Sequence, residues 1–369
     1  MATASRGTAT AAALAVAIAL ALAAGCLRAA AEEAAPPRSG FVIAPVVYYT
    51  PETRLAWGLV GIHHFRPGRA LQSSRLSHYR FNFVRTQNKQ SIAQVDYELY
   101  LADGKFLVDG MAKYSFFPDR FYGIGNRTRE EDREDFTSSN WRLQLNLQHR
   151  WGGNAFVGLH LETYDVSMRD RESAGKLAAG TLPGAAGGTV SGLGVFAKWD
   201  RRDNTFSPAS GTYVSLFFNR FFRALGGDFA FGQVSLDARG YFGLGRDEVV
   251  AVQGLLRAVQ GEAPFLMLPK FGGLNLLRGY YDGRFRDRGL LALQAEYRRP
   301  LWGRFGACVF AGFAQVQPRF SLLELSGFHP AGGAGLRYKF NRRENLNVRL
   351  DIGFAGPKPA FYLTFAEAF

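Results

Sequence analysis

From residue 41 to the end of the sequence, apolar and polar side chains alternate with a period of two. In NWRLQLNLQHR, residues 140–150, Trp141 and three leucines lie on one side, and Arg142 with three amides lies on the other. A helix would instead repeat its apolar positions every three to four residues. Each such segment therefore predicts a β-strand with one apolar and one polar face. The same alternation occurs in AQVDYELYL (93–101), GLLALQAEYR (289–298) and NLNVRLDIGF (345–354).

The length of these segments distinguishes between two kinds of sheet. An exported sandwich with one solvated face would have strands of about five or six residues. The segments here run to about ten or more, as tilted membrane strands do, and aromatic residues lie near many of their ends. A one-residue slip of 140–150 would turn Arg142 toward lipid at a cost of about 2–4 kcal/mol. Since open edges are not tolerated in hydrocarbon, we predict an all-β fold, a closed antiparallel transmembrane barrel with a polar lumen.

The turn signals divide the sequence into about sixteen strands. Short turns such as DGK, WGG, GRDE, WGR and NRRE fall on one side of the barrel, and the longer connections fall on the other. An even number of strands is usual for bacterial barrels, and it returns the last strand to the periplasm. The predicted strands begin near residues 41, 55, 77, 90, 105, 134, 153, 187, 210, 227, 247, 286, 303, 331, 345 and 358.

The first residues read as an export signal. The apolar stretch from about residue 11 to 24 is too short to span a bilayer, and it suits a signal peptide. Small residues favour cleavage after Ala31, and the alternative is a lipoprotein-type site at Cys26. We therefore expect a signal peptide at 1–31, a short periplasmic segment at 32–40 and an outer-membrane barrel at 41–369. This places the protein in the outer membrane of a Gram-negative type of cell.

The net charge indicates which partners the protein can have, and the cysteine content indicates whether it can form a disulfide. The formal net charge is +13, but the cations are scattered singly and the chain is exported, which argues against nucleic acid. Outer-membrane lipid headgroups and lipopolysaccharide are the more natural counter-charges. Cys308 is the only cysteine after the signal region, so we expect no internal disulfide and a packing role for this thiol.

A search for catalytic chemistry yields little. The six histidines have no metal-ligand spacing, and neither H-E-x-x-H nor G-x-S-x-G occurs, so we predict no catalytic residue, no metal and no cofactor. His160 and Glu162 share a lumenal face and form a possible dyad, but polar lining of a wet lumen is the favoured interpretation. The acidic run at 129–135 has two interpretations, a divalent-cation site and a solvated loop tip.

Two motifs carry more weight together than singly. WDRRDNTFSPASGTY, residues 199–213, lies between the eighth and ninth strands, and GGLNLLRGYYDG, residues 272–283, lies between the eleventh and twelfth. In this order and at these positions in a sixteen-strand count, they resemble the barrel of the BamA/TamA superfamily, also called the bacterial surface antigen family. The resemblance covers nearly the whole mature chain.

The resemblance implies roles for individual residues. In relatives the long loop folds back into the barrel, and its arginine contacts polar groups on the lumenal wall, so Arg278 should do the same. A guanidinium in that setting needs carboxylate or carbonyl partners. Asp351 and Glu296, which face the lumen by parity, are the candidate partners. The loop motif comprises Gly272, Gly273, Arg278, Gly279 and Tyr280, and the periplasmic turn motif comprises Asp200, Arg202, Pro208 and Gly211.

The sequence also departs from the family pattern. Relatives often carry F-x-D-x-G on the thirteenth strand as the partner of the arginine, whereas here Phe310 is followed by Gly312 and Ala314. Phe365 and the terminal Phe369 resemble the family's assembly signal, although Glu367 is an unusual neighbour. Relatives that insert or export proteins carry periplasmic POTRA modules. We expect none here, and hence no direct capture of clients by such modules unless another protein supplies them.

The expected function follows from the resemblance. The first hypothesis is outer-membrane biogenesis, by insertion or translocation of protein or lipid, with Arg278 anchoring a lumenal loop that braces or gates the barrel. Assembly proteins of the periplasm or the outer membrane are further candidate partners. The alternative is a passive, porin-like channel with weak anion preference, or a purely structural barrel. An enzyme acting on lipids is the third hypothesis. Client and oligomeric state stay open.

Overall fold

The structure is a computed structural model that describes residues 39–65, 77–342 and 345–369. The expected signal peptide and both candidate cleavage positions lie outside the described residues. The first strand begins at Ser39, two residues before the predicted start of the barrel domain, because Ser39 and Gly40 pair with Phe65 and His64 of β2.

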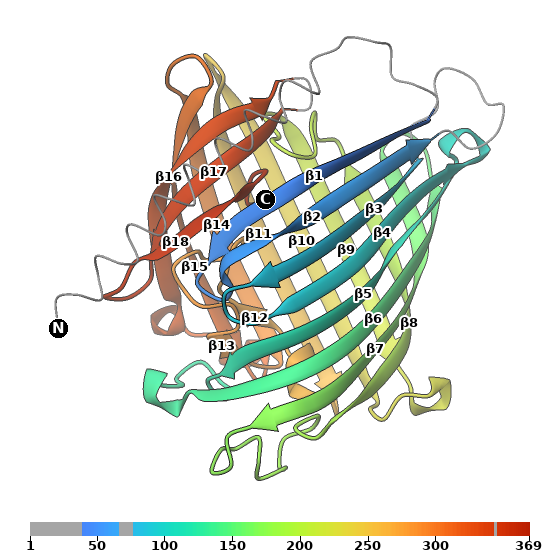
Figure 1. Ribbon diagram of the computed structural model, residues 1–369, viewed down its shortest axis with the longest axis vertical. Coiled ribbons are helices and arrows are strands. Elements are labelled where there is room, and N and C mark those ends of the chain that lie inside the picture. Colours follow the sequence, from blue (N-terminus) through green and yellow to red (C-terminus); the bar gives the residue numbers. More distant parts are fainter. Residues whose placement is uncertain (1–38, 66–76, 343–344) are drawn as a thin grey trace.

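Sixteen antiparallel strands close into a barrel, which confirms the predicted fold and strand count (Figure 1). Each strand pairs with its neighbours in sequence, β11 pairs with β14 across the long loop, and β1 meets β18. The strands of the barrel are β1 (Ser39–Thr50), β2 (Arg54–Phe65), β3 (Ser77–Thr86), β4 (Ser91–Leu101), β5 (Phe106–Phe121), β6 (Glu134–Arg150), β7 (Ala155–Arg171), β8 (Gly187–Asp200), β9 (Gly211–Phe221), β10 (Phe231–Gly245), β11 (Glu248–Gly261), β14 (Gly289–Pro300), β15 (Phe305–Gln317), β16 (His329–Asn341), β17 (Leu346–Phe354) and β18 (Ala360–Phe365).

The remaining elements lie in the connections. A two-residue antiparallel pair, β12 (Lys270–Phe271) with β13 (Phe285–Arg286), sits in the loop between β11 and β14. The short 3-10 helices are η1 (Ala102–Gly104), η2 (Glu130–Asp132), η3 (Arg223–Leu225), η4 (Phe265–Met267), η5 (Phe320–Leu322) and η6 (Leu325–Gly327). Among the described residues, no helix is long and apolar enough to cross a membrane.

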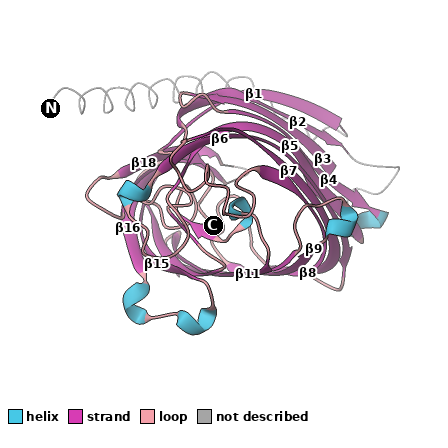
Figure 2. Cartoon of the chain, turned by 90° about the horizontal axis from the view of Figure 1, so that it is seen from below, coloured by secondary structure: helices cyan, strands magenta, loops and turns pink. Residues whose placement is uncertain are grey.

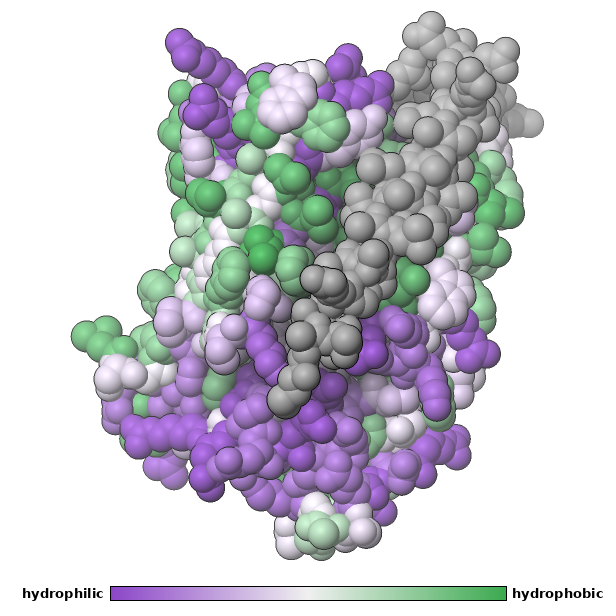
Figure 3. Space-filling view, turned by 60° about the vertical axis from the view of Figure 1, so that its left-hand side comes forward, coloured by the Kyte–Doolittle hydropathy of each residue, from purple (hydrophilic) through white to green (hydrophobic). Residues whose placement is uncertain are grey.

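The alternation in sequence becomes the two faces of the wall. In β6, Trp141 is 58% exposed on the outer face, whereas Gln148 is 4% exposed on the lumenal face. Hydrophobic side chains cover much of the barrel wall, and hydrophilic ones gather at the end that bears the long loops (Figure 3). This is the distribution that a membrane-spanning barrel requires, with apolar surface toward lipid and polar groups at the rims.

The turns differ between the two ends of the barrel, as the sequence predicted. The turn between β10 and β11 is a tight hairpin in which Arg246 and Asp247 both have positive φ, the geometry of a type I′ turn. At the opposite end, the connections at 122–133, 172–186, 262–288 and 318–328 are long (Figure 1). Two strands reach toward these loops, since β5 continues to Phe121 and β7 to Arg171.

The loop at 262–288, hereafter the lumenal loop, fills part of the barrel. Seen along the barrel, loops lie within the ring of strands (Figure 2). Phe271, Leu277 and Phe285 of this loop are buried against Leu290 and other apolar residues of the wall. The core of the molecule therefore lies inside the barrel and is organised around this loop.

The seam between β1 and β18 is the weakest part of the barrel wall. The pairing of β1 with β2 runs from Ser39↔Phe65 to Thr50↔Arg54. By contrast, the register of β1 with β18 comprises the single pair Tyr49↔Leu363 within the described part of the chain. Closure of the barrel thus depends on a short contact near one end of β1.

Candidate functional site

Glycines shape the backbone of the lumenal loop. Gly272 has φ +114°, and a Cβ placed there would lie 2.0 Å from the carbonyl oxygen of Tyr281, so only glycine fits this close approach. The N–H of Gly273 donates to the carbonyl of Tyr280 at 2.9 Å. These contacts form a narrow hairpin whose end carries Arg278 into the lumen.

Arg278 is 1% exposed and lies between two carboxylates of the wall. One guanidinium nitrogen, Nη2, contacts Glu296 on β14, and Nη1 lies 2.5 Å from Asp351 on β17. The guanidinium carbon stands 3.6 Å from the ring centre of Phe310 on β15. Two charge-assisted hydrogen bonds and a cation–π contact hold this buried cation, which would be costly without partners.

These contacts can be compared with the predicted partners. The structure brings Arg278 together with Glu296 and Asp351, the two residues selected by parity. The thirteenth strand provides the aromatic ring of Phe310 in place of an aspartate two positions later. At Gly312 a Cβ would lie 2.7 Å from the side chain of Gln294, so the backbone leaves no room for a carboxylate there without a shift of its neighbour.

The residues after Arg278 connect the loop to the last strand. The backbone N–H of Gly279 donates to the hydroxyl of Tyr362 on β18 at 2.9 Å. Tyr280 donates its hydroxyl to the carbonyl of Pro330 at 3.1 Å and stacks edge-on against Phe285. The loop motif therefore contacts the wall from β14 to β18, including the strand that forms one side of the seam.

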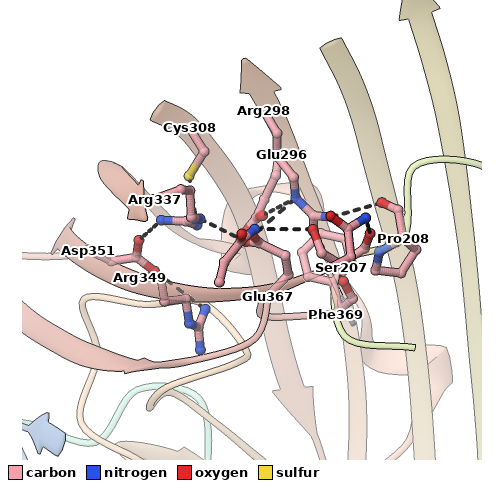
Figure 4. A network of polar contacts seen from close by, with 12 residues as sticks. Ser207, Pro208, Glu296, Arg298, Cys308, Arg337, Arg349, Asp351, Glu367 and Phe369 are labelled. Carbon is pink, nitrogen blue, oxygen red and sulfur yellow. Dashed lines mark hydrogen bonds and ion pairs between the residues drawn. The ribbon is translucent and has the colours of Figure 1, made fainter. Parts of the chain in front are cut away.

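Arg278 belongs to a larger group of buried charges, hereafter the arginine–carboxylate network. Figure 4 shows the other members of this network, among them Glu296, Arg337 and Asp351. Arg298 Nε lies 3.0 Å from Glu296, and Arg337 bridges Asp351 at 2.5 Å and Glu367 at 2.8 Å. Arg349 lies 3.4 Å from Asp351 and donates to Asn275 of the lumenal loop at 2.9 Å. The network comprises Arg278, Arg298, Arg337, Arg349, Glu296, Asp351 and Glu367.

Four members of this network, Arg298, Arg337, Arg349 and Glu367, were not predicted as site residues from the sequence. Arg298 and Arg349 stand two positions from Glu296 and Asp351, so the parity that selected the carboxylates also places both arginines in the lumen. On β16, the same alternation of side chains places Arg337 in the lumen. Glu367 could not be found in this way, because it lies after the end of β18.

The periplasmic turn motif contacts the same network from the end of the barrel opposite the long loops. Arg202 and Asp200 form a two-pronged ion pair at 2.8 and 2.9 Å, and a Cβ at Gly211 would lie 2.1 Å from the carbonyl oxygen of Arg201. Burial alone would lower the pKa of Arg202, but the hydrogen bonds to Asp200 and the negative charge of Asp200 raise this pKa. The carbonyl of Pro208 accepts a hydrogen bond from Arg298 at 3.3 Å. The turn therefore folds toward the lumen and meets the network.

The two phenylalanines of the predicted assembly signal occupy different places. Phe365 is the last residue of β18 and lies edge-on to Phe340. Phe369 lies beyond the strand, 4% exposed, inside the barrel, and its carbonyl accepts from Arg298 at 3.1 Å. The structure thus places Phe369 in the lumen and not on the lipid-facing wall. The signal role of both residues stays a prediction.

The other candidate chemistry is accounted for by local pairing. His160 Nε2 lies 3.3 Å from Glu162, and the same carboxylate accepts from Arg142 at 2.6 Å. No cluster of three or more potential metal ligands occurs in the part of the chain that the structure describes. Within the acidic run, residues 130–132 form η2, where Glu131 is exposed and pairs with Arg129 at 2.5 Å. Glu134 is instead buried at the start of β6 and accepts hydrogen bonds from the N–H groups of Lys176 and Leu177.

Together, these features define a transmembrane β-barrel protein with an inward-folded loop. The Omp85 superfamily domain matches residues 68–352. Because the match covers more than half of the 369 residues, the chain belongs to the Omp85 superfamily, and it is an outer-membrane barrel of that type. The predicted resemblance to BamA-like barrels is confirmed. No curated protein sequence matches the chain.

Solved structures show the same fold at low sequence identity. BamA from Haemophilus ducreyi, in a form lacking POTRA domains 1–3, superposes with a TM-score of 0.62 at 14% identity, over 89% of this chain and 70% of that one. CdiB from Escherichia coli superposes with a TM-score of 0.59 at 11% identity, over 91% of this chain and 63% of that one. CdiB from Acinetobacter baumannii superposes with a TM-score of 0.53 at 12% identity, over 89% of this chain and 59% of that one. The chain therefore spans about three fifths of each CdiB chain.

Proposed function

We propose that this protein acts in outer-membrane biogenesis, by inserting protein or lipid into the membrane or moving it across. In this proposal an N-terminal signal peptide exports the chain, and the barrel works through its seam. The lumenal loop, anchored by Arg278, braces the strands beside that seam. The mechanism is structural, since it requires the wall to open and close and involves no bond-making residue.

The short seam is the observation that carries the proposal. Only Tyr49↔Leu363 joins β1 to β18 among the described residues, so most of the outer edge of β1 has no strand beside it. Unpaired edge groups favour pairing with another strand and are costly in hydrocarbon. Separating β18 from β1 therefore disrupts far less pairing than separating any other two neighbouring strands.

The lumenal loop is well placed to control the seam. Tyr362 of β18 is fully buried, and its hydroxyl meets the backbone of Gly279 and Tyr280. Asp351 on the adjacent strand holds Arg278 of the same loop. Movement of the loop would therefore be felt directly by the last two strands of the barrel.

A pair of disulfide locks tests this proposal. Residues directly opposite in an antiparallel pair have Cα atoms about 4.5–5.5 Å apart, within the range a disulfide spans. Tyr49→Cys with Leu363→Cys closes the seam, and Tyr49→Cys with Leu55→Cys, opposite each other in β1 and β2, is the matched control. In cells depleted of the native copy, we expect the control to restore the outer-membrane protein and lipid content. The seam lock should restore it only after reduction.

Equal rescue by both oxidised variants would contradict a role for seam opening. The alternative, a passive channel, draws support from cavities of about 440 and 470 Å³ beside the lumenal loop. Recording in planar bilayers separates the two functions, because a steady open conductance that is unchanged by the seam lock would favour the channel.

A further inference from the structure

A polar cavity of about 440 Å³ lies between the lumenal loop and the part of the wall formed by β10 and β11. It lies inside the barrel, where loops occupy the ring of strands (Figure 2). Its charged residues all lie outside the arginine–carboxylate network, and three of them are cations and two are carboxylates. They are Asp237, Arg239, Arg257, Lys270 and Asp282. The cavity therefore carries a surplus of positive charge.

Both carboxylates of the cavity already have cationic partners. Asp237 accepts hydrogen bonds from Arg239, through Nε at 3.0 Å and Nη2 at 2.6 Å, and from the side chain of Gln253 at 2.9 Å. Asp282 pairs with Lys270 at 2.7 Å. The surplus charge is therefore that of Arg257.

Arg257 is the cation of the cavity that neither carboxylate contacts. In the part of the chain that the structure describes, its guanidinium forms no ion pair and no hydrogen bond. Asp237 and Asp282 attract it only from a distance. Its side chain is partly buried on the lumenal side, since Leu290, directly opposite it on β14, is fully buried. A cation held away from bulk water is costly without an anion, so its N–H donors are open to a ligand.

Two further groups can act on an anion in this cavity. Asn275 of the lumenal loop lines it, and its Oδ1 accepts from Arg349 at 2.9 Å, which leaves its amide N–H groups as donors. Lys113 of β5 lies within electrostatic range of Lys270 and Asp282. Among the described residues Lys113 also forms no ion pair and no hydrogen bond. An anion beside Arg257 would thus be attracted from the loop and from β5 as well.

We propose that this cavity binds a phosphate group, held by Arg257 and Lys270 with Asn275 as a further donor. The planar fork of a guanidinium matches two oxygens of a phosphate, and an ammonium serves as a point charge for a third. Lys270 can turn to a ligand, because its side chain is 33% exposed and that of Asp282 is 47% exposed.

The phosphate has two possible sources, the free ion and a lipid headgroup. The cavity lies within the usual size range of ligand sites, about 300–1,000 Å³, so it can hold either one. Only a lipid headgroup would give the proposed function a substrate class, and in that respect alone the inference rests on the proposed function.

Isothermal titration calorimetry of the purified full-length barrel, in a neutral detergent free of phosphate, tests the site. One titrant is inorganic phosphate, and the other is short-chain phosphatidylglycerol below its micelle concentration. We expect Arg257→Gln to weaken binding by roughly tenfold or more, because a charge-assisted hydrogen bond is lost. Lys113→Gln should weaken it less, since Lys113 acts only at a distance.

Arg80→Gln is the matched control. It removes the same charge from the lumen, but Arg80 lies outside the cavity and is already paired with Asp96 at 3.0 Å. Its effect on binding should be less than about twofold, because the charge of this pair is largely cancelled and screened. Folding of each variant is read from heat-modifiable migration on gels. If Arg257→Gln assembles poorly, Arg257→Lys provides the test, and an intermediate loss is expected because the charge remains without the fork.

Each outcome decides the inference. Equal binding by the parent and a folded Arg257→Gln protein would overturn the site, as would the absence of binding of either titrant to the parent. An equal loss in Arg80→Gln would overturn it too, because the overall charge of the lumen would then explain the attraction. Binding of inorganic phosphate alone would support a site for the free ion, and tighter binding of phosphatidylglycerol would support a lipid site. Binding requires no insertion or transport, so the site can fail while the proposed function stands, and the reverse.

Discussion

At the scale of single residues, the arginine–carboxylate network contains one more arginine than carboxylate side chains. The network has four arginines and three carboxylates, and Arg278 is the one arginine contributed by a loop. If Arg278 is removed, Glu296 keeps Arg298, and Asp351 keeps Arg337 and Arg349. The strands can therefore remain paired without the loop, which is the condition for a brace that binds and releases.

We predict that Arg278→Ala lowers the free energy of unfolding of the barrel by about 2–3 kcal/mol. Hydrogen bonds to charged groups contribute about 1.5–3 kcal/mol each, but removal of the buried guanidinium also relieves its desolvation cost, which offsets part of the sum. No unpaired carboxylate is left behind to raise the cost further. Urea unfolding in detergent, followed by heat-modifiable migration, measures the loss. The variant should also assemble less efficiently, with less effect on the ion selectivity of any pore.

Arg127→Ala is the control for this substitution. Arg127 is exposed and lies 3.7 Å from Glu324, so its removal should change the free energy of unfolding by less than about 1 kcal/mol. If Arg278→Ala proves no more destabilising than Arg127→Ala, the arginine does not brace the barrel.

Sequence alone could predict part of this site. The side of the wall on which Glu296 and Asp351 lie follows from a period of two, which is rigid in a strand. The contact with Phe310 depends on how far the loop reaches across the lumen, and no local pattern encodes that distance. Glu367 was noticed as unusual, but its place required the backbone to leave the strand at Ala366, a conformation that alanine rarely adopts.

At the scale of elements, the lumenal loop is attached near its outer end as well as through Arg278. The backbone N–H of Asp282 donates to the carboxylate of Glu52, in the turn between β1 and β2, at 2.8 Å. Tyr281 donates its hydroxyl to Asp119 of β5 at 3.0 Å, and burial raises the pKa of Tyr281. The loop thus connects the first strands of the barrel with the last.

The attachment at Glu52 should depend on pH. Burial raises the pKa of Glu52 above its ordinary value of 4.5, more than the hydrogen bonds from Thr50 and Asp282 lower it. A carboxyl group with a raised folded-state pKa contributes stability that is full below its unfolded pKa and is lost as pH rises through the folded value. We predict that the stability of the parent relative to Glu52→Gln falls as pH rises from about 4.5, by about 1.4 kcal/mol for each unit of pKa shift.

Urea unfolding of both proteins across this pH range provides the measurement. All other titrating groups are common to the two chains, so the difference isolates Glu52. A flat difference would show that folding leaves the pKa of Glu52 unchanged, and a difference that grows with pH would show that the buried carboxyl is stabilised as the anion; either result would reject the prediction.

The strands themselves were predictable because each one has one face toward lipid and the other toward a polar lumen. Lipid outside and water inside impose strict alternation over ten or more residues, and tight turns such as that at Arg246 and Asp247 mark the ends. The small β12–β13 pair and the turn of residues 366–369 into the lumen were not foreseen. Both lie within the lumen, where packing against distant strands determines the conformation.

At the scale of the whole molecule, the barrel is large enough for a pore but is partly filled. Phe271 and Phe285 of the lumenal loop lie in the buried core, and cavities of about 440 and 470 Å³ remain beside the loop. The loop therefore has two physical effects, since it braces the strands near the seam and obstructs the lumen. These effects can be separated, because obstruction needs the bulk of the loop and bracing needs Arg278.

We predict that replacing residues 272–284 with Gly-Gly increases the conductance of the barrel in planar bilayers several-fold. Phe271 and Phe285 pair directly, so two glycines can join them as a hairpin turn. The remaining charges of the arginine–carboxylate network balance, because Arg298, Arg337 and Arg349 match Glu296, Asp351 and Glu367, and the barrel should still fold.

Arg278→Ala should raise conductance much less, because the loop stays in place. Replacing residues 321–325, in the loop between β15 and β16 at the outside of the ring (Figure 2), is the control and should have no effect. An unchanged conductance in the shortened barrel would mean that something other than the lumenal loop closes the lumen.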